Sequence, residues 1–122
     1  MNVGGYFISQ RIPVKESDLT RAIQIALAQE GARVFRNETG SYQSPTGQWV
    51  SYGLIRGSSD LIGWSDDGRF VACEVKIPGG ITKKKRLEEQ KNFIQQVNRS
   101  GGIGFFAHSV EEAVRKYRER KA

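Results

Sequence analysis

A buried strand that carries two charged side chains constrains this chain more than any other stretch. Residues 70–77 read Phe-Val-Ala-Cys-Glu-Val-Lys-Ile, and side chains alternate between the two faces of a strand. One face is wholly apolar, whereas the other begins apolar and then carries Glu74 and Lys76. Burying a carboxylate or an ammonium group is costly unless the group is paired or bound to a metal. The strand therefore predicts a polar site within a packed core.

A tight turn before this strand predicts its partner. Asp66-Asp67-Gly68 is a strong hairpin signal, and a three-residue loop there pairs Ser65 with Arg69. Counting outward, this register places Asp60 opposite Glu74, whereas a loop one residue different makes the two acids diagonal neighbours only. Directly opposite side chains have Cβ atoms roughly 5 Å apart. The two carboxylates are then close enough to share one cation.

Two interpretations of the charged strand stay open. The first is a structural pair between Glu74 and Lys76 on a solvated sheet edge. The second is a metal site, which the matching position of Asp60 favours. Oxygen ligands without His or Cys suit Mg²⁺ or Mn²⁺ rather than zinc, and the single histidine, His108, lies outside this set. The lone cysteine, Cys73, excludes a Cys-rich zinc site and is interpreted as a small buried apolar residue.

Length and charge set wider limits. The 122 residues are enough for one domain with one core, so we expect residues 1–122 to form a single domain. Nineteen Lys and Arg against 13 Asp and Glu give a formal net charge of +6, which favours a polyanionic partner without distinguishing DNA, RNA and acidic protein. No stretch reaches the length of a membrane span and the N-terminus lacks a signal-peptide pattern. An intracellular protein without a membrane partner is expected.

Apolar spacing and turn residues predict the other elements. Ser17 or Asp18 is expected to cap the first helix, Gly31 to end it, and Ser109 with Glu112 to form a capping box for the last helix. The order α-β-β-β-β-α-β-α predicts an α/β fold with a mixed sheet flanked by helices. In chain order we expect a helix at 17–30, a strand at 33–36, a polar loop at 41–48, a strand at 49–55, two hairpin strands within 56–77, a helix at about 82–100, a strand at 103–107 and a final helix.

Two polar side chains lie in line with apolar helix stripes. Glu16 precedes Leu19 by one turn and would therefore tend toward the interior. The alternative is an acid favoured by the helix N-terminus. Gln90 lies on the stripe of the second helix, and a buried amide needs a partner. It makes either an ordinary core hydrogen bond or a contact with the acidic site.

Basic residues gather on two helices. The run Lys83-Lys84-Lys85-Arg86 lies on the first turns of the second helix, and the end of the last helix includes Arg115 and Arg118. Both groups are either solvated faces or phosphate contacts. The N-terminal arm, residues 1–13, contains the apolar patch Tyr6-Phe7-Ile8. It is either an edge strand or a contact for a second subunit.

The residues of the charged hairpin carry a resemblance. Asp60 followed by Glu74-Val75-Lys76 resembles the PD-(D/E)xK nucleases. The wider pattern, from about Glu16 to Ala113, resembles the VRR-NUC (virus-type replication-repair nuclease) domain. The Pro of the superfamily name is replaced here by Ser59. The wider pattern consists of Glu16 at a helix start, Arg36-Asn37 before a Gly-bearing loop, Gly57-Ser58-Ser59-Asp60-Leu61, and Gln90.

The resemblance implies a restriction-endonuclease-like core and a role for each matching residue. Asp60 and Glu74 would bind Mg²⁺ or Mn²⁺, with the carbonyl of Val75 as a further ligand. Lys76 would orient or deprotonate the attacking water, or stabilise the developing charge. The remaining implied roles are Glu16 holding metal-bound water or a second ion, Gln90 supporting the lysine or the phosphate, and Lys83, Lys84, Lys85, Arg86, Arg36, Asn37, Arg115 and Arg118 binding DNA.

The small size resembles the stand-alone viral and bacterial members, which are homodimers that act on branched DNA. This implies a Holliday-junction resolvase of DNA repair. The aromatic residues Tyr42, Trp49 and Tyr52 exceed what the core needs and are typical of subunit interfaces. They would alternatively pack on their own loop or stack on single-stranded bases. Other functions left open are a non-catalytic nucleic-acid-binding module and a less selective nickase or exonuclease. An acid–base enzyme for a small phosphorylated molecule is disfavoured, because the basic excess favours a polyanion and no Gly-rich phosphate loop is present.

Overall fold

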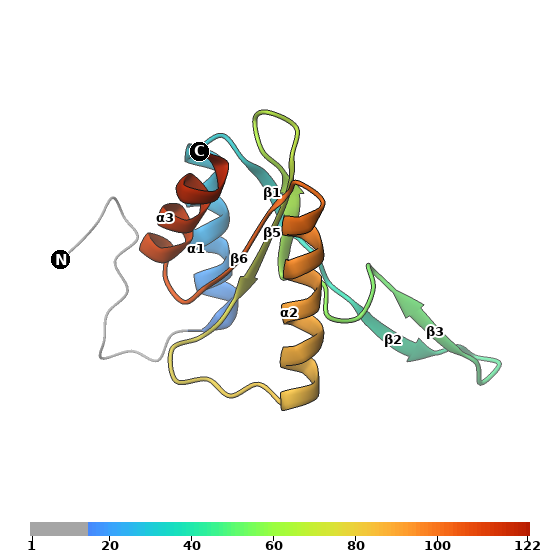
Figure 1. The fold of residues 1–122 in the computed structure, drawn as a ribbon. Helices are drawn as coiled ribbons and strands as arrows, with labels where there is room; N and C mark the ends of the chain where they lie inside the picture. Colours follow the sequence, from blue (N-terminus) through green and yellow to red (C-terminus); the bar gives the residue numbers. More distant parts are fainter. Residues whose placement is uncertain (1–14) are drawn as a thin grey trace.

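One mixed sheet of four strands, in the order β1–β4–β5–β6, forms the centre of the computed structural model (Figure 1). The structure describes residues 15–122, so the predicted role of the N-terminal arm lies outside the described residues. β5 and β6 run parallel, and the other neighbouring strands of this sheet are antiparallel. The elements are α1 (Glu16–Gln29), β1 (Arg33–Arg36), β2 (Gly40–Gln43), β3 (Trp49–Tyr52), β4 (Leu61–Trp64), β5 (Phe70–Val75), α2 (Lys84–Arg99), β6 (Ile103–Ala107) and α3 (Val110–Lys121).

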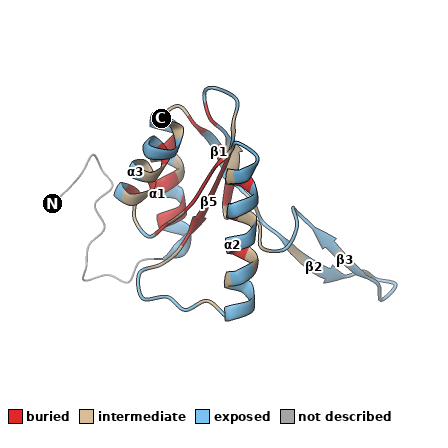
Figure 2. Ribbon diagram, viewed as in Figure 1, coloured by how far each residue is buried: buried red, intermediate tan, exposed pale blue. Residues whose placement is uncertain are grey.

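Helices cover both faces of this sheet. α1 and α3 lie side by side on one face, and α2 lies on the other (Figure 1). The predicted alternation of β5 explains the arrangement, because Val71, Cys73 and Val75 join the core beneath α1 and α3. Ala72 packs instead with residues of α2. Buried residues accordingly concentrate in β5 and on the inner faces of the helices (Figure 2). The predicted α/β fold with a mixed, helix-flanked sheet is confirmed.

The register of the β4–β5 hairpin agrees with the prediction from its turn. Leu61 lies opposite Cys73 and Trp64 opposite Phe70. The Ser65 amide donates to the Arg69 carbonyl at 2.8 Å, which closes the predicted three-residue loop. Extending this register by one residue places Asp60 opposite Glu74, on the face that α2 covers.

The prediction for residues 41–55 is wrong in part. The first three residues of the expected polar loop, together with Gly40, form the strand β2, which pairs antiparallel with β3 in a separate two-stranded sheet. The strand expected at 49–55 ends at Tyr52 and does not join the central sheet. Both faces of this hairpin are largely exposed, so its strands have no need for the apolar alternation that reveals a buried strand. A tight turn, in which the Ser44 amide donates to the Gln48 carbonyl at 2.7 Å, joins the two strands.

The helix starts agree with the prediction for α3 but not for α1. Ser109 Oγ accepts from the Glu112 amide at 3.0 Å, although the Glu112 carboxylate accepts from the His108 amide rather than from Ser109. α1 begins one residue earlier than predicted, with Lys15 as its N-cap and without a side-chain cap. Ser17 and Asp18 therefore lie inside its first turn. No helix among residues 15–122 is long and apolar enough to cross a membrane.

The loop that leads into β4 is packed tightly against α2 at Gly57. This glycine has a φ of +89°, and a Cβ atom there would lie 2.8 Å from Glu89 Cβ and 2.9 Å from the Glu89 carbonyl carbon. A neighbouring ion pair joins Arg56 Nε to Glu89 Oε1 at 3.2 Å. Only glycine fits this backbone conformation and this close approach together. The path of the chain toward Asp60 is thereby fixed relative to α2.

We expect Gly57→Ala to lower the free energy of unfolding by ~2–4 kcal/mol, because backbone strain and a steric clash with α2 add together. Gly79→Ala is the matched control, since Gly79 has a φ of +79° but a Cβ atom added there would meet nothing within 4 Å. It should cost only ~1 kcal/mol of backbone strain. Urea unfolding of both variants measures the difference. Equal losses would show that the contact with Glu89 does not hold the loop.

Candidate active site

Asp60 is held at the end of the hairpin by backbone and side-chain contacts. Its Oδ2 accepts from the Val75 amide at 2.8 Å, and its carbonyl accepts from the Asn37 amide at 2.8 Å. The Asn37 side-chain amide donates to Ser58 Oγ at 2.8 Å and to the Ser59 carbonyl at 2.9 Å. Asn37 therefore fixes the loop that presents Asp60. This positioning contact was not predicted, and the predicted DNA contact of Asn37 stays a prediction.

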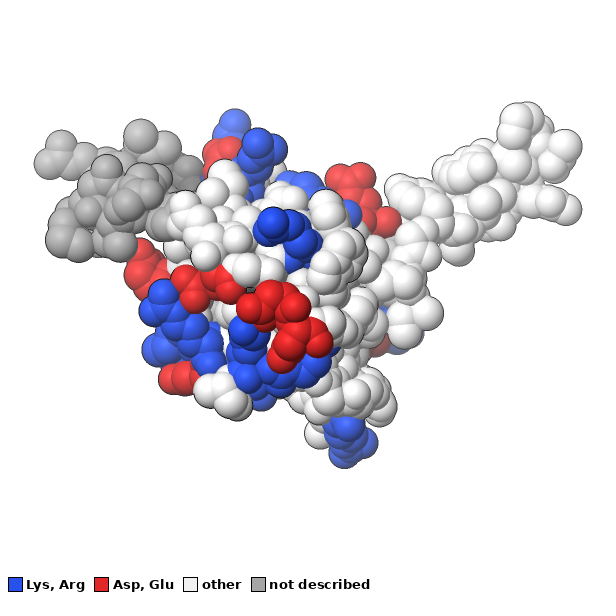
Figure 3. Space-filling model, turned by 90° about the horizontal axis from the view of Figure 1, so that it is seen from above, with Lys and Arg blue, Asp and Glu red and all other residues white. Residues whose placement is uncertain are grey.

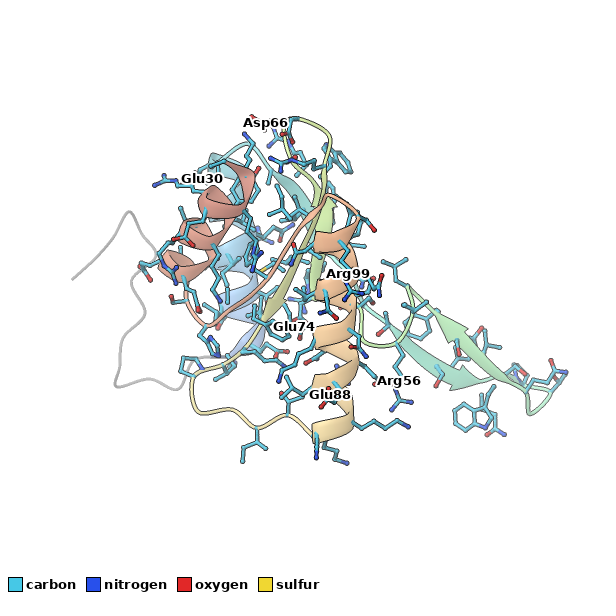
Figure 4. All side chains as sticks on the ribbon, viewed as in Figure 1. Glu30, Arg56, Asp66, Glu74, Glu88 and Arg99 are labelled. Carbon is cyan, nitrogen blue, oxygen red and sulfur yellow. The ribbon has the colours of Figure 1, made fainter. Side chains whose placement is uncertain are left out.

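Glu74 is a buried carboxylate with an incomplete set of partners. Its residue is 3% exposed, and Figure 4 shows it beside α2. Oε2 accepts from Gln90 Nε2 at 3.0 Å, whereas Oε1 has no hydrogen-bond partner among the described residues. Burial, together with the negative charge of the neighbouring Asp60, raises the pKa of Glu74 to about 8, although Lys76 and Arg86 act in the opposite direction. The two acids thus form the close pair that the hairpin register predicted.

Gln90 connects the acid to the lysine. Lys76 Nζ donates to Gln90 Oε1 at 2.6 Å and to Thr82 Oγ1 at 2.8 Å, and it lies 3.7 Å from Glu74 Oε2. The amide of Gln90 donates to Glu74 with its nitrogen and accepts from Lys76 with its oxygen. Of the two interpretations of Gln90, the contact with the acidic site is therefore confirmed. The simple structural pair considered for Glu74 and Lys76 is part of this larger network.

Thr82 is a member of the network that sequence reasoning missed. It lies on the loop between β5 and α2, six residues after Lys76 in the chain. In the sequence Thr82 only precedes the basic run at the expected start of the second helix, where threonine is common. The loop instead folds back and places the hydroxyl group on the lysine. No pattern in the sequence distinguishes these two uses of a threonine.

Glu16 does not join the acidic pair. It is the first residue of α1 and its side chain is exposed, which agrees with the alternative of an acid at a helix N-terminus and not with the inward orientation. Among the described residues, no three or more His, Cys, Asp or Glu side chains come together as a metal-binding group. The earlier start of α1 places Glu16 in the first turn, where a negative charge is favoured by the helix dipole. Its predicted role with metal-bound water stays a prediction.

The predicted basic contacts differ in their surroundings. All four residues of the run Lys83–Arg86 are exposed at the start of α2, and Arg86 is close enough to Glu74 to influence its pKa. Arg118 instead forms a bidentate ion pair with Glu30, with Nε 2.6 Å from Oε1 and Nη2 2.8 Å from Oε2. Arg115 Nη1 lies 3.3 Å from Glu119 Oε1. These two arginines belong to α3, on the other face of the sheet from α2. The run on α2 is therefore the basic group that lies with the acidic pair.

The acidic pair fits a divalent cation by its chemistry. Glu74 Oε1 is buried without a partner among the described residues, and the raised pKa of Glu74 shows that the nearby positive charges do not outweigh burial and repulsion. Carboxylate oxygens are the ligands that Mg²⁺ and Mn²⁺ prefer. A cation between Asp60 and Glu74 would offset the repulsion between the two acids. The Val75 amide already binds Asp60, while the predicted ligand role of the Val75 carbonyl stays a prediction.

In metal-free protein, Glu74 should make stability depend on pH. The folded state holds its proton up to a pH of about 8, whereas the unfolded carboxyl group has the ordinary pKa of 4.5. The free energy of unfolding therefore falls as the pH rises between these two values. We expect Glu74→Gln to remove this fall. Above a pH of about 8, the free energy of unfolding of the variant should exceed that of the wild type by ~1–3 kcal/mol, because a neutral amide can donate to Asp60.

Urea unfolding in a chelator, at about pH 5 and about pH 9, measures this difference. Glu88→Gln on the exposed side of α2 is the matched control and should retain the pH dependence of the wild type. A Glu74→Gln variant with the same pH dependence as the wild type would contradict the electrostatic description of the site.

A model of the VRR-NUC domain matches residues 15–111, a range that includes both acids, Lys76, Gln90 and the loop held by Asn37. None of the curated protein sequences matches the chain. VRR-NUC domains are nucleases of the PD-(D/E)xK type, and their substrate is DNA. Asp60, Glu74 and Lys76 match the Asp, Glu and Lys in the name of this superfamily, and Ser59 stands in place of its Pro. Because the match covers most of its length, the chain belongs to the VRR-NUC family of nucleases.

Proposed function

We propose that the chain is a DNA endonuclease that depends on Mg²⁺ or Mn²⁺, held by Asp60 and Glu74. The single observation that carries the metal is Glu74 Oε1, a buried carboxylate oxygen without a partner among the described residues, beside a second acid. When bound, the metal would polarise a phosphoryl oxygen and activate water. A nucleic-acid-binding module without activity has no use for such a costly buried acid, so this alternative is disfavoured.

The side chains around the acids have separate tasks in this proposal. The Val75 amide fixes the orientation of Asp60, and Gln90 sets the distance between Glu74 and Lys76. An ammonium group has three donors, of which Gln90 and Thr82 take two. The third donor is left for a phosphate oxygen or the attacking water. Lys76 thereby places positive charge where negative charge develops in the transition state.

Branched DNA and a homodimer complete the proposal. A two-fold dimer would present two identical sites to strands of opposite polarity, and paired incisions across a four-way junction would follow. Three aromatic residues of the β2–β3 hairpin support it, since Tyr42, Trp49 and Tyr52 are 52%, 72% and 52% exposed. They do not pack into the central core, which leaves them available to a partner. A Holliday-junction resolvase of DNA repair is the function that this arrangement supports best.

We expect Asp60→Ala, Glu74→Ala and Lys76→Ala each to reduce cleavage by about 10²–10³-fold or more, because each removes a metal ligand or a charge that stabilises the transition state. Cleavage of a synthetic four-way junction and of a linear duplex in Mg²⁺ measures the effect. Glu88→Ala, an exposed acid on α2, should cut at the wild-type rate.

The same assay tests the site assignment and the selectivity for junctions separately. Wild-type cleavage by purified Glu74→Ala would overturn the site. Equal cleavage of junction and duplex by the wild type would overturn the junction selectivity, in favour of a less selective nickase. The metal-nuclease assignment would stand in the second case.

Charge reversal at Lys84 and Lys85 should weaken DNA binding for all sequences. Each lost phosphate contact reduces counterion release, so the slope of log affinity against log salt should become shallower by about two. A reversal at Arg99 and Arg120 changes the net charge equally, at exposed positions outside the basic run. It should leave the slope nearly unchanged. Titration of a fluorescent duplex at several salt concentrations compares the two, and identical slopes would show that the run is only a solvated helix start.

A further inference from the structure

The β2–β3 hairpin extends away from the central sheet (Figure 1). Among the described residues, the pairing of β2 with β3 is the only extensive contact that either strand makes. The strand residues are exposed except for Gly40 and Val50, which are half-buried. An isolated two-stranded hairpin is at best marginally stable in water. The hairpin therefore lacks the support that a buried face would give it.

The same segment is free of charge. Residues 39–55 contain no Lys, Arg, Asp or Glu, although 26% of the whole chain is charged. In Figure 3 the projecting β2–β3 hairpin is white and carries no blue or red side chain. Affinity for a phosphate backbone comes from Lys and Arg, whereas the core of a protein interface is depleted of charge and rich in aromatic residues. The composition of the hairpin thus favours a protein partner over a nucleic acid.

An apolar groove lies on the α2 side of the central sheet. α2 packs on β5 and β6 but makes no extensive contact with β1 or β4, so the face of these two strands is open. A hollow of about 660 Å³ between α2 and β5 adjoins one of about 570 Å³ over β1 and β4, because both are lined by Gly68 and Phe70. Together the two hollows form one apolar groove, whose apolar surface consists of Phe35, Leu54, Ile55, Ile62, Trp64, Phe70 and Phe93.

The groove exposes large apolar side chains that a partner would cover. Phe35 and Trp64 are each 52% exposed, Phe70 is 41% exposed and Ile55 is 70% exposed. The ring centroids of Phe35 and Trp64 lie 5.7 Å apart, so the two side chains form one continuous aromatic surface. A contiguous apolar patch of this kind on a soluble protein marks an interaction site.

We propose that the hairpin of one copy inserts its aromatic residues into the apolar groove of a second copy, reciprocally across a two-fold axis. The hairpin is uncharged and aromatic, and the groove is open and lined mainly by apolar side chains. The hairpin extends away from its own α2 and sheet (Figure 1), so it does not fill its own groove. A two-fold axis joins each hairpin to the other copy's groove and uses both surfaces twice. This inference names the contact surface of the proposed homodimer and rests on that part of the proposed function.

Sedimentation of the wild type and two double variants tests the contact. The hairpin variant is Trp49→Ser with Tyr52→Ser, and the groove variant is Phe35→Ser with Trp64→Ser; all four side chains are at least half exposed, so folding should survive and circular dichroism verifies it. We expect a dimeric wild type at micromolar concentration and at least a tenfold weaker self-association of each variant. Ile81→Ser is the matched control, because Ile81 is 97% exposed and lies outside both surfaces; it should remain dimeric.

Mixing the two variants provides the decisive measurement. A heterodimer keeps one intact contact, between the hairpin of the groove variant and the groove of the hairpin variant. Fluorescence anisotropy of one labelled variant should therefore show tighter association with the other variant than with itself. Absence of this rescue, or variants that remain dimeric, would overturn the proposal and leave a homodimer with another interface. A monomeric wild type that still cuts DNA would overturn the dimer and leave the nuclease assignment intact.

Discussion

The burial of Glu74 beside Asp60 is the interaction on which the arrangement of the site depends. Two neighbouring carboxylates repel each other, and this repulsion adds to burial in raising the pKa of Glu74 to about 8. The fold tolerates the pair because Gln90 and Lys76 bind one side of it. The strand register is equally constrained, since a slip of one residue would turn Glu74 toward the apolar core beneath α1 and α3. The length of the turn after β4 therefore determines which face of the sheet carries Glu74.

The sequence predicted this hairpin well, because the turn, the alternation of β5 and the position of Asp60 are all local patterns. It predicted β2 poorly, since a strand with two solvated faces leaves no periodic trace. The inward expectation for Glu16 was extrapolated from an apolar stripe that begins at Leu19, and the first residue of a helix can follow such a stripe and still be exposed. Thr82 gave no signal, since its contact with Lys76 depends on the path of a loop. Local patterns thus anticipated the paired acids, while contacts across loops required the structure.

The surface that carries the excess positive charge is visible only in the structure. A formal charge of +6 predicts a polyanionic partner but no surface. In the structure, Arg115 and Arg118 are engaged by carboxylates, whereas the basic run at the start of α2 is exposed near the acidic pair. The side of the sheet that carries the acids is therefore also the side with basic residues near them. The proposed function therefore assigns DNA binding and cleavage to the same face of the sheet.

The contact of Gly57 with Glu89 has a mechanical consequence. α2 carries the basic run at its first turns, and Gln90 and the residue that Gly57 contacts, Glu89, lie farther along the same continuous hydrogen-bonded helix. In the proposed function DNA binds the basic run, and a displacement of α2 on binding would then shift both Gln90 and the loop that presents Asp60. Binding of the substrate and alignment of the two acids would then be coupled through α2.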